Sequence, residues 1–387
     1  MDHGWTRRRL AVARAAAVVA ACAVFPVHGQ ELLVGQVSSQ TSPVTAVNAR
    51  GLYMGINVYF SHVNAKGGVR GRMVKLVNKD DQLAPGKMTE MTKEFIADKS
   101  ILALVGYQNT AGITELAKLN LAGQAGIAMI APFQGDKSIV SAPNFFPFRS
   151  GYPDEVIAMV KEAHNTQKRN VVVVYQSATY GPAMMQLCQE VAKKEGLNVV
   201  DYVKIDTTAG DKINAVIKDV VAAVVKSAPD AAILLVGGRP APELAKQLRE
   251  SPAQDAQLYM MSVVPPGDVI KAAGEQKARG IVFTQAVPFP FSATLPLVGE
   301  YQKLMKEYAP NEPYSFSTLE GFVAGKITVE ALRRAGPKPT RAGVLKVLNN
   351  MGELDLGGVY VNYSSKARNG WGLVDLTVIG PGGKLLR

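Results

Sequence analysis

The stretch NAKGGVRGR, residues 64–72, fits two kinds of local structure, and each would indicate a different class of protein. Its glycines and basic residues suit either a loop that cradles a phosphate or a helix end followed by a tight turn. A phosphate loop follows a strand and opens a helix, so that free amides of the helix start face the anion. Here the order is reversed, because apolar residues at helical spacing over 45–65 precede the glycines and the apolar run MVKLVN follows them. We therefore predict a helix, a turn that uses Gly67 and Gly71, and a strand over 73–78.

Short apolar runs alternate with amphipathic segments on both sides of this stretch. Fully apolar runs separated by helical segments are typical of parallel strands buried on both faces. The expected strands form two series, 32–37, 73–78, 101–106 and 127–132, then 170–176, 198–205, 231–238, 257–263 and 280–285. Repeated strand–helix units predict a doubly wound α/β fold.

Two segments rich in proline, 141–155 and 286–296, separate these series from each other and from the last part of the chain. Helices are expected from Leu295 to about Asn350, and a short pair of strands, GGVYVNY and LVDLTVIG, closes the chain. We predict two lobes joined by several crossings, with a cleft between them. The expected N-terminal lobe comprises 30–149 and 286–366, and the expected C-terminal lobe comprises 150–285 and 367–387.

Residues 1–29 have the pattern of a signal peptide, with a basic start, a short apolar run and, at the end, the signal-peptidase cleavage site VHG. This pattern predicts export to the periplasm and a mature chain that starts near Gln30. Two variants stay open. VAAC, ending at Cys22, loosely resembles a lipoprotein signal that would add a lipid anchor, and TRRRLA loosely resembles a twin-arginine signal.

The formal charge of the whole chain is +11, of which the leader's four arginines and one aspartate supply +3. No run of basic residues with interleaved aromatics follows the leader, so we expect a solvated basic surface and no nucleic-acid partner. Cys188 is the one cysteine of the expected mature chain, which excludes an internal disulfide, and its helical context predicts burial in the core. His62 and His164 lie far apart. A zinc site or a Ser-His-Asp triad is therefore poorly supported. We expect no metal, no cofactor and no enzymatic activity.

Several motifs together resemble the leucine/isoleucine/valine-binding protein family, the type I solute-binding proteins of ABC importers. The early signature VNAKGGVRGRMVKLVNKDDQLAPGKM (63–88) includes the paired acids Asp80 and Asp81. Further matches are VVVVYQSATYGPAM (171–184), DAAILLVGG (230–238), STLEGFVAGKITVEALRRAG (317–336) and the end of the chain. The resemblance covers nearly all of the mature chain. It implies two α/β lobes, a hinge of three crossings and a small polar ligand closed between the lobes.

In open α/β sheets, ligands bind beyond the carboxyl ends of the strands. The loop SSQTSP (38–43) follows the first strand, and its Ser39 and Gln40 are candidates, with simple N-capping as the alternative. The resemblance places Thr110 where a hydroxyl holds the ligand's carboxylate, with Gln108 and Asn109 beside it. It also places Phe133, Gln134 and Gly135 where the family uses backbone groups.

In the second lobe, the resemblance places Tyr180 where the family often has an aromatic over the ligand, with packing at the rim as the alternative. Arg239 follows a buried strand and could grip a carboxylate, or it could be a surface residue that caps a turn. Amino-acid-binding members of the family usually carry an acidic residue in the second lobe that pairs with the ligand's ammonium group. The resemblance places Val263 and Val264 near that position. An unpaired buried ammonium is costly, so a carboxylate without an amine is the preferred ligand, unless an acid from elsewhere substitutes. The disulfide that the family has in the first lobe is also absent, because the residues around Gln82 and Asn109, where its cysteines would lie, are not cysteines.

These observations predict a periplasmic solute-binding protein, monomeric, that delivers a small carboxylate or amino-acid-like ligand to ABC permease subunits in the inner membrane. A receptor subunit of the same fold that senses the ligand is the alternative, and the sequence does not separate the two. An exported α/β enzyme is disfavoured, because no GxSxG or phosphate-binding glycine fingerprint occurs.

Overall fold

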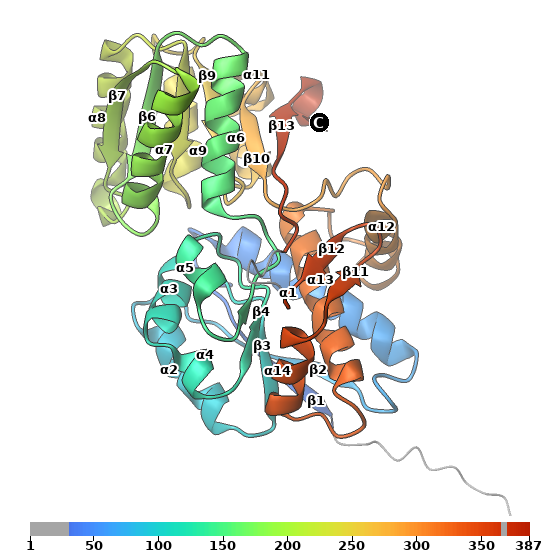
Figure 1. Cartoon of the computed structure of the whole chain (residues 1–387). Helices are drawn as coiled ribbons and strands as arrows, with labels where there is room; N and C mark the ends of the chain where they lie inside the picture. Colours follow the sequence, from blue (N-terminus) through green and yellow to red (C-terminus); the bar gives the residue numbers. More distant parts are fainter. Residues whose placement is uncertain (1–30, 365–369) are drawn as a thin grey trace, which may run out of the picture.

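The computed structural model describes residues 31–364 and 370–387, which form two α/β lobes (Figure 1). The predicted signal peptide, including Cys22, lies outside the described residues, and so does the predicted lobe boundary at 366. No helix within the described part of the chain is long and apolar enough to cross a membrane.

The N-terminal lobe is built on a parallel sheet in the order β2-β1-β3-β4-β5. Its strands are β1 (Leu32–Val37), β2 (Val74–Lys79), β3 (Ile101–Val105), β4 (Ala128–Ile130) and β5 (Phe145–Phe146). The inner strands β3 and β4 are buried at every position, as their apolar sequences predict.

The C-terminal lobe has a sheet in the order β14-β13-β10-β9-β8-β6-β7. Its parallel strands are β6 (Val171–Gln176), β7 (Val199–Ile205), β8 (Ala231–Leu235), β9 (Gln257–Met260) and β10 (Val282–Gln285), and its antiparallel edge is β13 (Asp375–Ile379) and β14 (Leu385–Leu386). The two predicted strand series and the doubly wound α/β fold are thus confirmed.

The two strands predicted at the end of the chain are present and belong to different sheets. The last two predicted strands do not pair with each other. Instead, β12 (Tyr360–Asn362) pairs with β11 (Glu353–Asp355), whereas β13 joins the sheet of the other lobe beside β10. The partner of β12 is its neighbour in the chain, whereas the partner of β13 is set by the crossing between the lobes.

Helices cover both sheets and connect their strands (Figure 1). They are α1 (Ala46–Ala65), α2 (Lys87–Ala97), α3 (Thr110–Lys118), α4 (Leu121–Gln124), α5 (Lys137–Ser141), α6 (Tyr152–Asn165), α7 (Gly181–Glu195), α8 (Ile213–Lys226), α9 (Pro240–Arg249), α10 (Pro266–Ala273), α11 (Glu275–Ala278), α12 (Pro296–Tyr308), α13 (Phe316–Arg334) and α14 (Arg341–Asn349). The expected helical region after Leu295 is therefore confirmed as α12 to α14.

The glycine-rich stretch 64–72 is a turn between α1 and β2, as its order of elements predicts. The amides of Gly67 and Gly68 close the helix on the carbonyls of Asn64 and Val63. Gly67 and Gly71 have φ of 90° and 80°, a region that favours glycine. Cys188 is buried in the core of the C-terminal lobe, as expected.

Helix α1 packs closely against α13. A Cβ at Gly55 would lie 2.0 Å from the carbonyl oxygen of Thr318, and one at Gly321 would lie 2.2 Å from that of Leu52. Only glycine allows the two backbones to approach this far. The start of α1 lies near the C-terminal lobe (Figure 1), where the side chain of Asn48 bonds to Val263.

The chain passes between the two sheets after β5, after β10, and between β12 and β13, where part of the connection lies outside the described residues. Three crossings are what the resemblance implies for the hinge. The exact lobe boundaries at 149 and 285 remain predictions.

Candidate functional site

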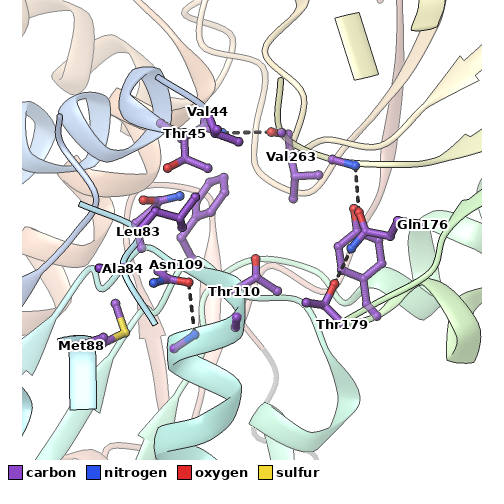
Figure 2. Close-up of a pocket in the computed structure, with 18 of the residues that line it drawn as sticks. Val44, Thr45, Leu83, Ala84, Met88, Asn109, Thr110, Gln176, Thr179 and Val263 are labelled. Atoms are coloured by element: carbon purple, nitrogen blue, oxygen red, sulfur yellow. Dashed lines mark hydrogen bonds between the residues drawn. The ribbon is translucent and has the colours of Figure 1, made fainter. Parts of the chain in front are cut away.

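A cavity of about 390 Å³ lies between the two lobes. Its walls come from segments that follow β1, β2, β3 and β4 on one side and β6, β8 and β9 on the other. Because these are the carboxyl ends of parallel strands, the cavity occupies the place where open α/β sheets bind ligands. Figure 2 shows the side chains from both lobes that surround it. The lining residues used below are Val44, Thr45, Asn48, Leu83, Met88, Gln108, Asn109, Thr110, Ala111, Gly112, Glu115, Phe133, Gln176, Thr179, Tyr180, Gly237, Gly238, Val263 and Asp268.

The structure brings six of the predicted site residues together around this cavity: Gln108, Asn109, Thr110, Phe133, Tyr180 and Val263. The start of α3 is the polar centre of this group. Asn109 is its N-cap, and the side-chain oxygen of Asn109 accepts a hydrogen bond from the amide of Gly112 at 3.1 Å. The amides of Thr110 and Ala111 remain as first-turn donors that need acceptors from outside the helix.

Four other predicted residues of the N-terminal lobe lie behind the wall. Ser39 is buried and donates its hydroxyl to Asp81 at 2.5 Å, and the amide of Gln40 donates to Asp80 at 3.0 Å. The side-chain amide of Gln134 donates to the carbonyl of Thr110 at 3.1 Å. The carbonyl of Gly135 accepts from the amide of Tyr152 at 2.7 Å. None of the four lines the cavity, so in this conformation they support its wall.

Arg239, on the C-terminal lobe, also does not line the cavity; it is exposed at the start of α9. Its neighbour Gly238 lies at the rim, where an added Cβ would meet a methyl group of Val44 at 2.8 Å. The position fits the alternative of a surface arginine at a turn.

The wall from the C-terminal lobe centres on Tyr180 and Gln176. The side-chain oxygen of Gln176 accepts from the amide of Gly237 at 3.1 Å, and its nitrogen donates to the hydroxyl of Thr179 (Figure 2). Tyr180 packs on Tyr152 with ring centroids 4.6 Å apart, and burial raises the pKa of Tyr180 well above its ordinary value.

Two buried hydroxyls that line the cavity, those of Thr45 and Tyr180, have no hydrogen-bond partner within the described part of the chain. They come from opposite lobes. A buried hydroxyl without a partner costs free energy, which a ligand with suitable donors or acceptors recovers.

Two carboxylates that were not predicted from the sequence also line the cavity, Glu115 in α3 and Asp268 in the first turn of α10. Asp268 lies five residues after Val263, the position near which the family resemblance implies an acid. Partial burial raises the pKa of Asp268, while Lys271 lowers it. The two prolines that open α10 and the acid in its first turn were the available signal. No Lys, Arg or His is among the lining residues that the structure describes.

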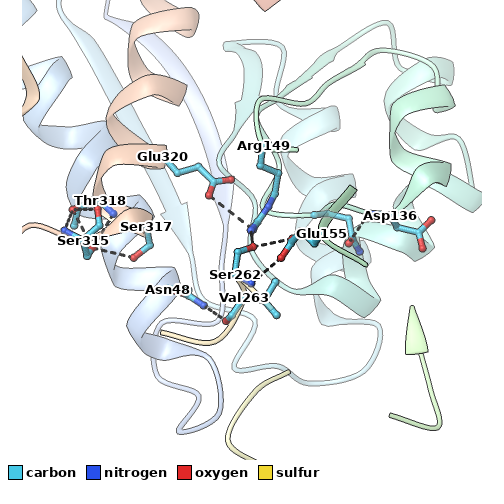
Figure 3. A network of polar contacts seen from close by, with 11 residues as sticks. Asn48, Asp136, Arg149, Glu155, Ser262, Val263, Ser315, Ser317, Thr318 and Glu320 are labelled. Carbon is cyan, nitrogen blue, oxygen red and sulfur yellow. Dashed lines mark hydrogen bonds and ion pairs between the residues drawn. The ribbon is translucent and has the colours of Figure 1, made fainter. Parts of the chain in front are cut away.

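A hydrogen bond from the start of α1 joins the two lobes across the cleft. The side-chain amide of Asn48 donates to the carbonyl of Val263 at 2.9 Å (Figure 3). Because Asn48 and Val263 both line the cavity, this contact bridges its two walls.

A buried polar network lies at the hinge beside the cavity (Figure 3). Arg149, in the first crossing, donates to the hydroxyl of Ser262 at 2.5 Å and stacks over the ring of Phe133, 4.1 Å from its centroid. Two carboxylates flank this guanidinium, Glu155 on α6 and Glu320 on α13. An oxygen of Glu320 lies 3.9 Å from a guanidinium nitrogen of Arg149. The network therefore joins a cavity-lining ring to both lobes.

No group of three or more His, Cys, Asp or Glu in the described ranges is placed to hold a metal ion. The loop pair that the family's disulfide would join is instead joined by a hydrogen bond, from the side-chain amide of Asn109 to Asp81 at 2.7 Å.

Comparison with known proteins agrees with this architecture. An amino acid binding protein of Pseudomonas aeruginosa is 24% identical over 275 residues, which cover 68% of this chain and 69% of that protein. The crystal structure of an extracellular ligand-binding receptor from Verminephrobacter eiseniae is 26% identical, with a TM-score of 0.84, and the match covers 92% of this chain and 100% of that one.

A protein described as a possible leucine/isoleucine/valine-binding protein, from Rhodopirellula baltica, has the same fold, with 23% identity, a TM-score of 0.81 and coverage of 94% and 98%. The resemblance found in the sequence motifs is thus confirmed. The family model described as "Periplasmic binding protein" matches residues 31–376. The chain therefore belongs to the periplasmic binding protein family.

Proposed function

We propose that this protein is the solute-binding component of an ABC importer, which captures a small amino-acid-like ligand in the periplasm and passes it to permease subunits in the inner membrane. The observation that carries the proposal is the cavity of about 390 Å³ with walls from both lobes. Its volume is in the lower part of the range of small-molecule sites. We propose that the protein acts as a monomer and that no bond of the ligand is made or broken.

The walls favour a ligand with a carboxylate, an ammonium group and an apolar part. The free amides at the start of α3 and the hydroxyl of Thr110 suit a carboxylate. Asp268 on the opposite lobe suits an ammonium group. Apolar side chains such as Val44, Leu83, Met88 and Phe133 suit the remainder.

The position of Asp268 changes the balance between the two ligand classes. The preference for a carboxylate without an amine was based on the lack of an acid near Val263. With two carboxylates and no cationic side chain among the described lining residues, a ligand carrying only negative charge would be repelled. We therefore favour an α-amino acid with an apolar side chain, in line with the name of the Pseudomonas relative.

Closure of the lobes around the ligand is part of the proposal. A ligand that contacts both walls shifts the population toward the closed state by its extra affinity for that state. Closure should lower the radius of gyration when ligand is added, which small-angle X-ray scattering measures. An unchanged radius of gyration at saturating ligand would contradict closure.

The test uses the mature protein, residues 30–387, and three probes that differ by one group. L-leucine carries both charges, 4-methylpentanoate lacks the amine and 3-methylbutylamine lacks the carboxylate. Native mass spectrometry first identifies any co-purified ligand, and calorimetric titration then measures the three affinities. We expect leucine to bind best. Tighter binding of 4-methylpentanoate would instead support a carboxylate without an amine, and binding of none of the three would remove this ligand class.

A further inference from the structure

We propose that Asp81 is a positioning residue of the ligand site, which fixes the side chain of Asn109 and through it the start of α3. This inference rests on the proposed function, because it concerns the same cavity. Asp81 itself does not line the cavity.

The carboxylate of Asp81 is the meeting point of three loops of the N-terminal lobe. It is fully buried. One of its oxygens, Oδ1, accepts from the hydroxyl of Ser39 at 2.5 Å and from the amide of Leu83 at 3.1 Å. The other, Oδ2, accepts from the side-chain amide of Asn109 at 2.7 Å. The loops after β1, β2 and β3, all of which contribute cavity-lining residues, are therefore tied to one group.

An ionised carboxylate only accepts hydrogen bonds, and this decides how the Asn109 side chain is oriented. Its nitrogen must face Asp81, so its oxygen is left to face the helix. That oxygen accepts from the amide of Gly112 and caps α3. The cap uses one first-turn amide and leaves those of Thr110 and Ala111 for a ligand.

The sequence offers a substitution that separates this bond from the rest of the cluster. Asp81→Asn keeps an oxygen for Ser39 and Leu83 but places an NH₂ group against the NH₂ group of Asn109. The chain of bonds from Asp81 to Gly112 is then broken at one link, and the side chain of Asn109 is free to turn around. Asp81→Asn combined with Asn109→Asp restores the hydrogen bond between the two positions, with position 81 now the donor and position 109 the acceptor. The carboxylate introduced at position 109 then accepts from the amide introduced at position 81 and also caps Gly112.

The experiment measures hydrogen exchange with fragments that resolve residues 110–113, in the ligand-free mature protein, for wild type, both variants and Asp230→Asn. Asp230 is an exposed control outside the cavity, whose carboxylate also accepts from backbone amides, those of Arg169 and Asn170 in the other lobe. We expect Asp81→Asn to speed exchange at Gly112 by roughly tenfold, as expected for the loss of a cap. The double variant should return to wild type, and the control should not change.

Affinity for L-leucine, measured by calorimetry, gives the second readout. We expect Asp81→Asn to weaken it by roughly tenfold while Asp230→Asn does not. Unchanged exchange in Asp81→Asn, or no restoration in the double variant, would overturn the proposal. Faster exchange with unchanged leucine affinity would also overturn it, by limiting Asp81 to a structural role. If wild type does not bind leucine, the amino-acid form of the proposed function fails, and the exchange data still decide the role of Asp81.

Discussion

Glu155 and Glu320 lie on either side of Arg149, one on each lobe, and both are almost completely buried. Glu155 accepts three hydrogen bonds from its own lobe, from the amide and hydroxyl of Ser262 at 2.8 and 2.9 Å and from the hydroxyl of Thr284 at 2.5 Å. Glu320 has only the distant contact with Arg149, and its Oε1 has no partner among the described residues.

The difference teaches how the hinge is stabilised. A buried carboxylate is stable as an anion when donors surround it, and it tends to take up a proton when they do not. Burial raises the pKa of Glu320 to about 7, although Arg149 lowers it. On the side of the C-terminal lobe, both oxygens of Glu155 accept hydrogen bonds. On the side of the N-terminal lobe, Glu320 lacks such donors, and its raised pKa brings its titration close to neutral pH.

The largest effect is expected from removing the hydrogen bonds that Glu155 accepts. Glu155→Ala leaves the donors of Ser262 and Thr284 unsatisfied and removes a negative charge near Arg149. We expect a loss of about 3–5 kcal/mol in the free energy of unfolding, measured by urea denaturation at neutral pH. Glu190→Ala, at an exposed position of α7, is the control. A loss below about 1 kcal/mol would mean that the three hydrogen bonds do not stabilise the lobe as their geometry indicates.

The second prediction concerns the pH dependence due to Glu320. Its pKa is raised in the folded protein, from the ordinary value of 4.5 to about 7, so the folded state binds more protons in this interval. The contribution to stability is present below the unfolded pKa and is lost as pH rises through the folded pKa, with a slope of at most about 1.4 kcal/mol per pH unit.

We expect Glu320→Gln to flatten this slope between about pH 4.5 and 7, the interval set by the two pKa values. Thermal unfolding across that range measures it. Glu312→Gln, at an exposed position, should keep the wild-type slope. An identical slope in wild type and Glu320→Gln would show that Glu320 stays ionised in spite of its missing donors.

A third carboxylate sharpens the comparison, because Asp268 in the cleft lacks side-chain donors among the described residues and is expected to find its partner in the ligand. Asp268→Asn should weaken binding of L-leucine by about tenfold to a hundredfold, since a charge-assisted contact with the ammonium is lost. Binding of 4-methylpentanoate should not weaken. Calorimetry with both probes measures this, with Asp255→Asn as an exposed control. Equal losses for both probes would argue against an ammonium partner.

The smallest effect is expected from the contact that bridges the cleft. Asn48→Ala removes the hydrogen bond to the carbonyl of Val263 and should weaken ligand binding by only a few-fold, corresponding to about 0.5–1.5 kcal/mol. Asn57→Ala is matched to it, because Asn57 lies on the same helix and bonds to the carbonyl of Tyr53 within that helix. If both variants bind alike, the bridge does not contribute to the closed state.

Much of the fold, and part of the site, could be predicted from the sequence. The apolar runs determined the strands, the order helix–glycine–strand determined the turn at Gly67, and the carboxyl-end rule with the family resemblance led to Thr110, Phe133 and Tyr180 at the cavity. These predictions succeed because each depends on residues a few positions apart, or on a rule that holds for every parallel sheet.

Other features were decided only by the tertiary structure. The placement of Asp268 in the cleft, the exposed position of Arg239 and the pairing of β13 with β10 depend on how distant elements pack in space. The bond between Arg149 and Ser262 joins residues 113 positions apart, and the bond between Ser39 and Asp81 joins residues 42 apart. No local pattern encodes such pairs, because a buried polar side chain takes whichever donor the packed elements bring to it.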